Sequence, residues 1–145
     1  MHFKTRLATV FDKPLIYSLY QEAMKHHIEI IWGWDESWQQ NDFEKSFDSA
    51  TNFIIETNDK FSGYFQLERA VGFDYLRMLI VTPSLRSRGI GRQLLVQIIK
   101  ESYQSKKKLR LRVFKINTKA LRFYTNNGLS VIEEDEAFYL MENIS

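Results

Sequence analysis

The 145-residue chain has no cysteine, and it has only two prolines and six glycines. Without cysteine it cannot form disulfide bonds, thiolate metal sites or an acyl-cysteine intermediate. Proline and glycine are too few for linkers or low-complexity segments, so we expect residues 1–145 to form a single domain. No apolar run approaches the length of a membrane span, and the first thirteen residues, MHFKTRLATVFDK, contain no signal-peptide core. We therefore expect a cytoplasmic protein with no membrane partner.

The chain also lacks a large excess of positive or negative charge. The formal net charge is +2, which is too small to indicate a nucleic-acid partner. Apolar residues are abundant instead: they make up 44% of the chain, which is ample for one buried core.

Hydrophobic periodicity and turn residues predict strands and helices in the order β-α-α-β-β-β-α-β-α-β-β. This order describes an α/β protein with a mixed sheet and helices on both faces. We expect Asp12 to cap the first helix, and we expect an aromatic connector between the first two helices, at 26–36. The predicted strands are 3–8, 52–57, 60–67, 75–81, 109–113, 129–134 and 137–142. The predicted helices begin at 12, at 35 or 36, at 90, and at 117 or 118, and they end near 25, 47, 103 and 128.

The stretch 73–103 joins a strand to a helix through a short loop that contains glycine. The β-like run ends before Pro83, and from Ile90 the apolar residues recur at helical spacing. Backbone N–H groups and the dipole at a helix start favour an anion, and Gly89 and Gly91 let a phosphate approach the main chain. We therefore interpret the loop as a phosphate cradle, with a tight turn that binds nothing as the alternative.

Two common nucleotide-binding motifs do not fit this loop. A Walker loop requires Lys-Ser or Lys-Thr after its second glycine, where this chain has Arg92-Gln93. A dinucleotide fingerprint requires a third glycine at position 94, which is Leu94.

Two other motifs of the chain have known counterparts. The first reads Ile80-Val81-x-Pro83 followed by Arg86-x-x-Gly89-x-Gly91, and it resembles the acetyl-CoA signature of the GNAT-type N-acetyltransferase family. The second resembles the second CoA element of the family and reads Val113-Phe114-x-x-Asn117-x-x-Ala120-x-x-Phe123-Tyr124-x-x-x-Gly128-Leu129. The resemblance covers about residues 3–142, and within it only the insert 26–47 has no family-wide pattern to match.

The resemblance implies the GNAT fold, which is a mostly antiparallel sheet of six or seven strands with a splayed parallel pair in its middle. Here that pair would be 75–81 and 109–113. It also implies direct transfer of an acetyl group, in a ternary complex, from acetyl-CoA to a primary amine. The acceptor would be a small molecule or a peptide, and no metal would be required.

The family's cofactor-binding positions transfer to this chain as follows. Main-chain groups of Leu79, Ile80 and Val81 would bind the pantetheine arm and orient the acetyl carbonyl. Amides around the loop would hold the pyrophosphate; these belong to Ser87, Arg88, Gly89, Ile90 and Gly91. The side chains of Arg86 and Arg88 would assist, would reach the ribose phosphate, or would simply be solvated.

The second motif supplies an asparagine and a tyrosine. Asn117 has two roles open to it, which are compatible: it would cap the following helix or bind the cofactor arm. Tyr124 would protonate the departing thiolate. The alternative for Tyr124 is a core tyrosine whose hydroxyl is satisfied elsewhere.

The general base is not determined by the resemblance. Some family members place a glutamate five residues before the motif asparagine, where this chain has Arg112. The remaining candidates are a water chain or one of Asp74, His27, Glu29, Asp35 and Glu36. A metal is not expected, because the pair His26-His27 has no third ligand.

Three features leave alternatives open. Trp32, Trp34 and Trp38 would either line the acceptor pocket or pack two helices together. The basic cluster of Lys106–Lys108, Arg110 and Arg112 is most simply solvated charge, or else a landing place for an acidic partner. The same fold would also suit a CoA sensor that transfers nothing, or an enzyme with a longer acyl donor, and it permits a homodimer.

Overall fold

Seven strands form one sheet across residues 2–144, which are the residues that the computed structural model describes. The strand order is β1-β2-β3-β4-β5-β7-β6, and every neighbouring pair is antiparallel except β4–β5. The strands are β1 (Lys4–Leu7), β2 (Thr51–Thr57), β3 (Lys60–Arg69), β4 (Phe73–Val81), β5 (Lys108–Phe114), β6 (Leu129–Glu134) and β7 (Phe138–Asn143). The predicted mixed, mostly antiparallel sheet with a central parallel pair is confirmed.

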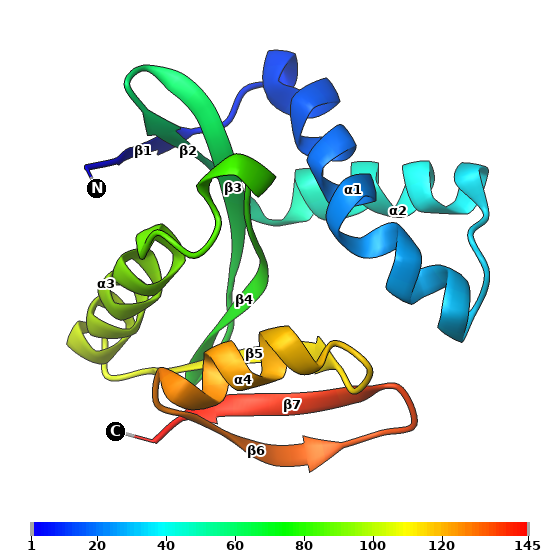
Figure 1. Ribbon diagram of the computed structural model, residues 1–145. Coiled ribbons are helices and arrows are strands. Elements are labelled where there is room, and N and C mark those ends of the chain that lie inside the picture. The colour runs from blue at the N-terminus through cyan, green and yellow to red at the C-terminus, as the bar shows by residue number, and fades with distance from the viewer. Residues whose placement is uncertain (1, 145) are drawn as a thin grey trace.

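Helices cover both faces of this sheet (Figure 1). They are α1 (Lys13–Ile31), α2 (Glu36–Ser49), α3 (Ile90–Gln104) and α4 (Thr118–Asn126), with short 3-10 turns η1 (Val10–Asp12) and η2 (Pro83–Leu85). No helix within residues 2–144 has both the length and the apolar character needed to cross a bilayer.

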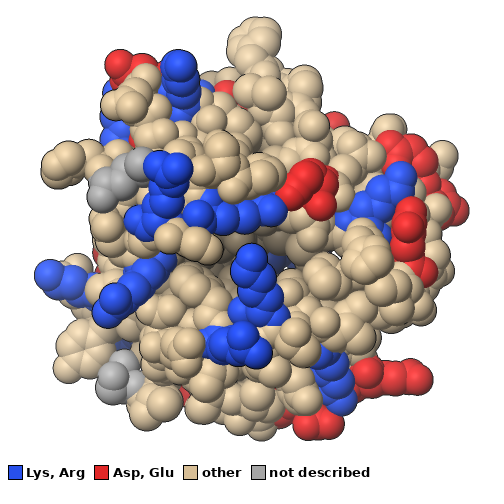
Figure 2. All heavy atoms as spheres, viewed as in Figure 1, with Lys and Arg blue, Asp and Glu red and all other residues tan. Residues whose placement is uncertain are grey.

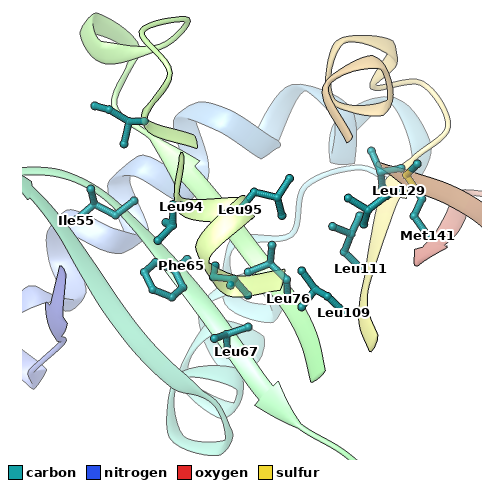
Figure 3. Close-up of a cluster of buried hydrophobic side chains, with 13 residues drawn as sticks. Ile55, Phe65, Leu67, Leu76, Leu94, Leu95, Leu109, Leu111, Leu129 and Met141 are labelled. Atoms are coloured by element: carbon teal, nitrogen blue, oxygen red, sulfur yellow. The ribbon is translucent and has the colours of Figure 1, made fainter. Parts of the chain in front are cut away.

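Each face of the sheet has its own core. On one face, the predicted apolar stripe of α3 packs on the strands; Figure 3 shows its Leu94 and Leu95 near Leu76, Leu109 and Leu111. On the other face, α1 and α2 pack on β2, β3 and β4, and the buried residues are Ile16, Leu19, Phe43, Ile54, Tyr64 and Ile80. The central strands of the sheet are therefore covered on both faces.

The first helix is longer than predicted. We expected it to end near Lys25, but α1 continues to Ile31, so the residues read as an aromatic connector are largely helical. Ile28 is buried, and Gly33, two residues after the end of the helix, has φ +80° and donates to the carbonyl of Ile28 (3.1 Å). The stop signal is thus the glycine, as is common for helix C-termini.

Asp12 occupies the N-cap position of α1, as predicted, but its side chain makes no hydrogen bond to the first turn of that helix. Its carboxylate accepts hydrogen bonds from the backbone N–H of Thr9 (2.7 Å) and from the guanidinium of Arg6 (2.8 and 3.0 Å). The Arg6 hydrogen bonds are the main reason that the pKa of Asp12 falls to about 2. Asp12 therefore joins η1 to β1 instead of satisfying the N-terminus of α1.

Candidate functional site

The parallel strands β4 and β5 pair at one end only. Their backbone register runs from Phe73 opposite Lys108 to Tyr75 opposite Arg110 and then stops. Beyond that point β4 continues along β3 to Val81, while β5 continues along β7 to Phe114. Figure 1 shows the two strands diverging. The predicted splay is therefore present, and it opens toward the carboxyl ends of both strands.

A β-bulge lies on β4 where the divergence begins. Met78 pairs with Gln66 and Leu76 pairs with Leu67, so Arg77 is an extra residue on β4. A bulge bends its strand and increases the local twist. It also changes which residues face α3: Leu76 does so before the bulge, and Leu79 and Val81 do so after it.

The paired end of the two strands is fixed by a buried carboxylate. Asp74 is fully buried and accepts hydrogen bonds from Arg69 (2.8 Å) and from Ser102 of α3 (2.7 Å). The ammonium group of Lys107 lies 3.5 Å from its other oxygen. All its neighbours are thus at the end of β4 opposite to the functional loop, so Asp74 is not placed to act as a general base.

The loop between β4 and α3 has the geometry of an anion site. Ser87 and Gly89 both have left-handed backbone conformations, with φ +63° and +87°. Gly89 is the N-cap of α3 and no side chain bonds the free N–H groups of the first turn. These groups and the helix dipole together favour a phosphate. A Cβ on Gly91 would lie 3.5 Å from Phe123, an ordinary contact, so only Gly89 is conformationally required here.

A cavity of about 400 Å³, the loop cavity, adjoins this turn. It is bordered by α1, the end of β4, the start of α3 and α4. Of the predicted cofactor-binding residues all but Arg88 line it, namely Leu79, Ile80, Val81, Arg86, Ser87, Gly89, Ile90, Gly91, Asn117 and Tyr124. Figure 2 views the molecule from this side and shows a hollow bordered by Lys and Arg side chains.

Sequence reasoning missed two cations on this cavity. Arg92, in the first turn of α3, and Lys119, in the first turn of α4, both line it. Their positions in the sequence could have revealed them. Arg92 follows the motif residue Gly91, Lys119 lies between the motif residues Asn117 and Ala120, and both are at the start of a helix. They supply positive charge on both sides of the loop.

Arg86 has a different environment from the one predicted. Its guanidinium forms two hydrogen bonds with Glu22 of α1 (2.7 and 2.9 Å) and one with the carbonyl of Val81 (2.8 Å). It is therefore not simply a solvated loop charge. It ties α1 to the loop at the border of the loop cavity, and its role in binding phosphate stays a prediction.

Asn117 and Tyr124 lie where β5 leads into α4. The side chain of Asn117 caps α4 by accepting from the N–H of Ala120 (3.2 Å), so the capping role is confirmed. Tyr124 is half-buried, and burial raises the pKa of its hydroxyl to about 12. No hydrogen bond from another residue in the range 2–144 satisfies that hydroxyl, which removes the alternative of a satisfied core tyrosine.

Among the five candidate bases, only His27 lines a cavity. It lies on α1, half-buried, beside the loop cavity. Burial, with a smaller effect of neighbouring His26, lowers the pKa of His27, so its imidazole is neutral at pH 7. The other candidates lie away from the cavities: Asp35 caps α2, Glu36 accepts from the indole of Trp34, and Glu29 faces Lys25.

A second cavity of about 430 Å³, the tryptophan cavity, lies on the α1 and α2 side of the sheet. Trp32 and Trp38 line it, and both are about 60% exposed, at 61% and 59%. Trp34 does not line it; its ring packs near Tyr20, with a centroid distance of 6.1 Å. Two of the three indoles are thus cavity walls and not the packed core of two helices.

The two cavities meet. They share six lining residues from α1, β4 and α4, which are Met24, Leu79, Ile80, Asn117, Ala120 and Tyr124. The two cavities therefore lie next to each other around Tyr124.

The predicted basic cluster is not simply solvated. Lys107 pairs with Asp74, Lys108 donates to the carbonyls of Asn143 and Ile144, and Arg110 pairs with Glu142 (2.8 Å). Arg112 lines the tryptophan cavity. Four of the five predicted cations therefore have a structural partner or a place in a cavity, and Lys106 is exposed, as expected of solvated charge.

Comparison with known proteins identifies the family. The model of the acetyltransferase (GNAT) family matches residues 14–129. The chain belongs to this family. Acetyltransferase PseH of Campylobacter jejuni strain 81-176 is 29% identical over 139 residues, covering 83% of this chain and 87% of that protein. PseH of a second strain, NCTC 11168, is 31% identical over 109 residues, covering 68% of each.

Solved structures of GNAT proteins share the fold. The PaiA N-acetyltransferase of Thermoplasma acidophilum, in complex with coenzyme A, has a TM-score of 0.77, 19% identity and 99% coverage of both chains. A GNAT acetyltransferase of Elizabethkingia anophelis with acetyl-CoA bound has a TM-score of 0.74, 15% identity and 97% coverage of both chains. The chain is therefore a GNAT acyltransferase, and its reaction is the transfer of an acetyl group to an amine.

Proposed function

We propose that the chain is a single-domain N-acetyltransferase that uses acetyl-CoA as its donor and takes a small-molecule or peptide amine through the tryptophan cavity. The observation that carries this proposal is the meeting of the two cavities beside Tyr124. The loop cavity fits a diphosphate, because it combines the uncapped N-terminus of α3 with the cations Arg92 and Lys119. Structurally similar proteins that bind CoA or acetyl-CoA add support.

The open strands would hold the thioester. Between Leu79 and Val81, β4 pairs with no strand of residues 2–144 on its β5 side. Apart from the carbonyl of Val81, which accepts from Arg86, its outward main-chain groups would bond the amide-like pantetheine arm as an added strand would. One of these N–H groups would also stabilise the oxyanion that forms when the amine attacks, an interaction worth about 10² to 10³ in rate.

His27 and Tyr124 would handle the protons. The amine nitrogen forms a bond to the carbonyl carbon, and the bond from that carbon to sulfur breaks. His27 accepts the proton that the nitrogen loses, directly or through water, because its lowered pKa leaves the imidazole neutral. Tyr124 donates a proton to the departing sulfur and regains one from solvent; its raised pKa keeps it protonated until then.

Two measurements test this function together. Acetyl-CoA should raise the melting temperature by an amount that grows with ligand concentration. Thiol release from acetyl-CoA should then depend on an added primary amine. Stabilisation without thiol release for any amine would favour the CoA sensor, and the absence of both would contradict the proposal. The homodimer and the cytoplasmic location stay predictions.

A further inference from the structure

Arg112 is the one feature of the tryptophan cavity that the reaction does not explain. Two arginines and one carboxylate, Arg77, Arg112 and Asp42, line this cavity. Arg77 is balanced by acidic partners, since its guanidinium lies 3.4 Å from Glu68 and 3.8 Å from Asp42. An excess positive charge therefore remains, and it belongs to Arg112.

The guanidinium of Arg112 is presented to solvent and has no carboxylate within 4.0 Å among residues 2–144. It lies over the ring of Tyr75, with a distance of 5.6 Å to the ring centroid, and donates a long hydrogen bond of 3.4 Å to the Tyr75 hydroxyl. Hydrogen bonds from the backbone N–H groups of Phe138 and Ala137 lower the pKa of Asp135, and the charge of Arg112 has a smaller effect in the same direction. No ion pair joins Arg112 and Asp135. The contact with the Tyr75 ring and hydroxyl helps to position the guanidinium, and it leaves the other N–H donors of Arg112 available to a ligand.

Aromatic rings form part of the wall of the tryptophan cavity. Phe114, two residues further along β5, stacks on Phe138 of β7 with a centroid distance of 4.5 Å. Trp32 packs against both rings, at 5.7 and 5.8 Å. All three rings line the same cavity as Arg112. A ring-shaped body could lie against these walls with an acidic group beside the guanidinium.

We infer that Arg112 selects the acceptor: the amine acetylated by this enzyme carries an anionic group, a carboxylate or a phosphate, which Arg112 binds while the ring of the acceptor lies against Trp32. This inference rests on the proposed function and specifies its substrate class. Arginine is suited to the task because its fork of N–H donors matches the oxygens of either anion. Acceptors that carry a second positive charge are disfavoured for the same reason.

Matched benzylamines test the inference. The set is benzylamine, para-(aminomethyl)benzoate, para-(aminomethyl)phenyl phosphate and para-xylylenediamine, which share the benzylamine body and carry no charge, a carboxylate, a phosphate or a second ammonium group at the para position. The anionic members should have kcat/KM values about 10- to 100-fold above benzylamine, the range of one charge-assisted hydrogen bond, and the diamine should be the poorest. The anionic acceptor with the higher kcat/KM shows whether the site prefers a carboxylate or a phosphate. Equal values across the set would overturn the inference.

Arg112→Gln should remove this preference by raising the KM of the anionic acceptors, with little change in the KM of acetyl-CoA. Arg110→Gln is the matched control, because Arg110 lies on the same strand, pairs with Glu142 and lines neither cavity. If Arg112→Gln keeps the preference, the inference is wrong even though acetyl transfer stands.

A binding readout covers the case in which no benzylamine is turned over. With CoA at saturation, benzoate or phenyl phosphate should raise the melting temperature of the wild type and of Arg110→Gln but not of Arg112→Gln, and neutral benzamide should raise none. Equal effects of benzoate, phenyl phosphate and benzamide would overturn the inference. Failure of acetyl-CoA itself to bind or to lose its thiol would instead overturn the proposed function.

Discussion

The two ends of the β4–β5 pair are built in opposite ways. At one end Asp74 is fully buried and gathers partners from β3, α3 and the segment before β5. At the other end the strands have separated, and Leu79, Asn117 and Tyr124 border two cavities that meet there. At one end, the ion pairs and the hydrogen bond of Asp74 hold the two strands together. At the other end, the strands are apart and leave room for ligands.

The difference shows how a sheet can contain a gap without losing its order. A buried carboxylate with several partners fixes the start of both strands, and the bulge at Arg77 then turns β4 away from β5. Each separated strand keeps a full ladder on its outer side, with β3 or with β7. The open end is therefore a fixed feature of the fold, and changes at the two ends should have separable effects.

The largest effect is expected from the hydroxyl at the open end. Tyr124→Phe should lower kcat by about 10² to 10⁴, because the departing sulfur loses its proton donor. Acetyl-CoA should still bind, since the ring is kept. Tyr103→Phe is the control, because Tyr103 is a 71% exposed residue on α3 that should tolerate the change. Unchanged turnover of Tyr124→Phe would remove this residue from the mechanism.

A pH profile examines the proposed base at the same end. The burial of His27 lowers its pKa below the usual 6.5. Only the neutral imidazole accepts a proton, so kcat/KM should fall as the pH drops through that lowered pKa and should be level above it. His27→Asn should lower kcat/KM at neutral pH by about 10² and abolish this acid limb. His26→Asn should retain both, and a limb that survives in His27→Asn would exclude His27 as the base.

The closed end should govern stability and not chemistry. Asp74→Asn leaves Arg69 and Lys107 without their buried partner, so we expect the free energy of unfolding to fall by about 3 kcal/mol in urea titrations. Turnover of the folded fraction should stay close to that of the wild type. Glu142→Gln, which removes a partly exposed pair with Arg110, should cost about 1 kcal/mol or less. Equal losses of stability for the two variants would contradict the proposal that Asp74 fixes the paired end of β4 and β5.

The smallest effect separates the two glycines of the loop. Gly89 has φ +87°, so Gly89→Ala strains the turn and should weaken acetyl-CoA binding by about tenfold. Gly91→Ala should change the affinity little, because its new Cβ meets only Phe123 at 3.5 Å. Calorimetric titration of both variants measures the difference. Equal affinities would show that the loop backbone does not need its left-handed residue.

The sequence predicted the local features of the site well. Short-range patterns were sufficient for these features. Turn residues, capping residues and apolar periods predicted the glycine loop, the cap at Asn117 and the order of the strands along the chain. The end of α1 was predicted too early, although Gly33 lies just beyond it, because the residues before Gly33 were interpreted as an aromatic connector.

Long-range features could not be predicted in this way. The pair formed by Arg86 and Glu22 joins residues 64 positions apart, and no local pattern marks it. The bulge at Arg77 depends on the register with β3, and the splay followed only from family resemblance. Which residues line a cavity also depends on contacts that are distant in sequence. Trp32 and Trp34 are only two positions apart, yet of these two only Trp32 lines the tryptophan cavity.

A crystal structure of the complex with CoA would test the account most directly. We predict that the diphosphate lies on the N–H groups at Gly89–Gly91 and that the sulfur lies between the separated strands, within hydrogen-bond reach of the Tyr124 hydroxyl. A CoA molecule bound elsewhere, or strands that pair along their full length around it, would contradict the account.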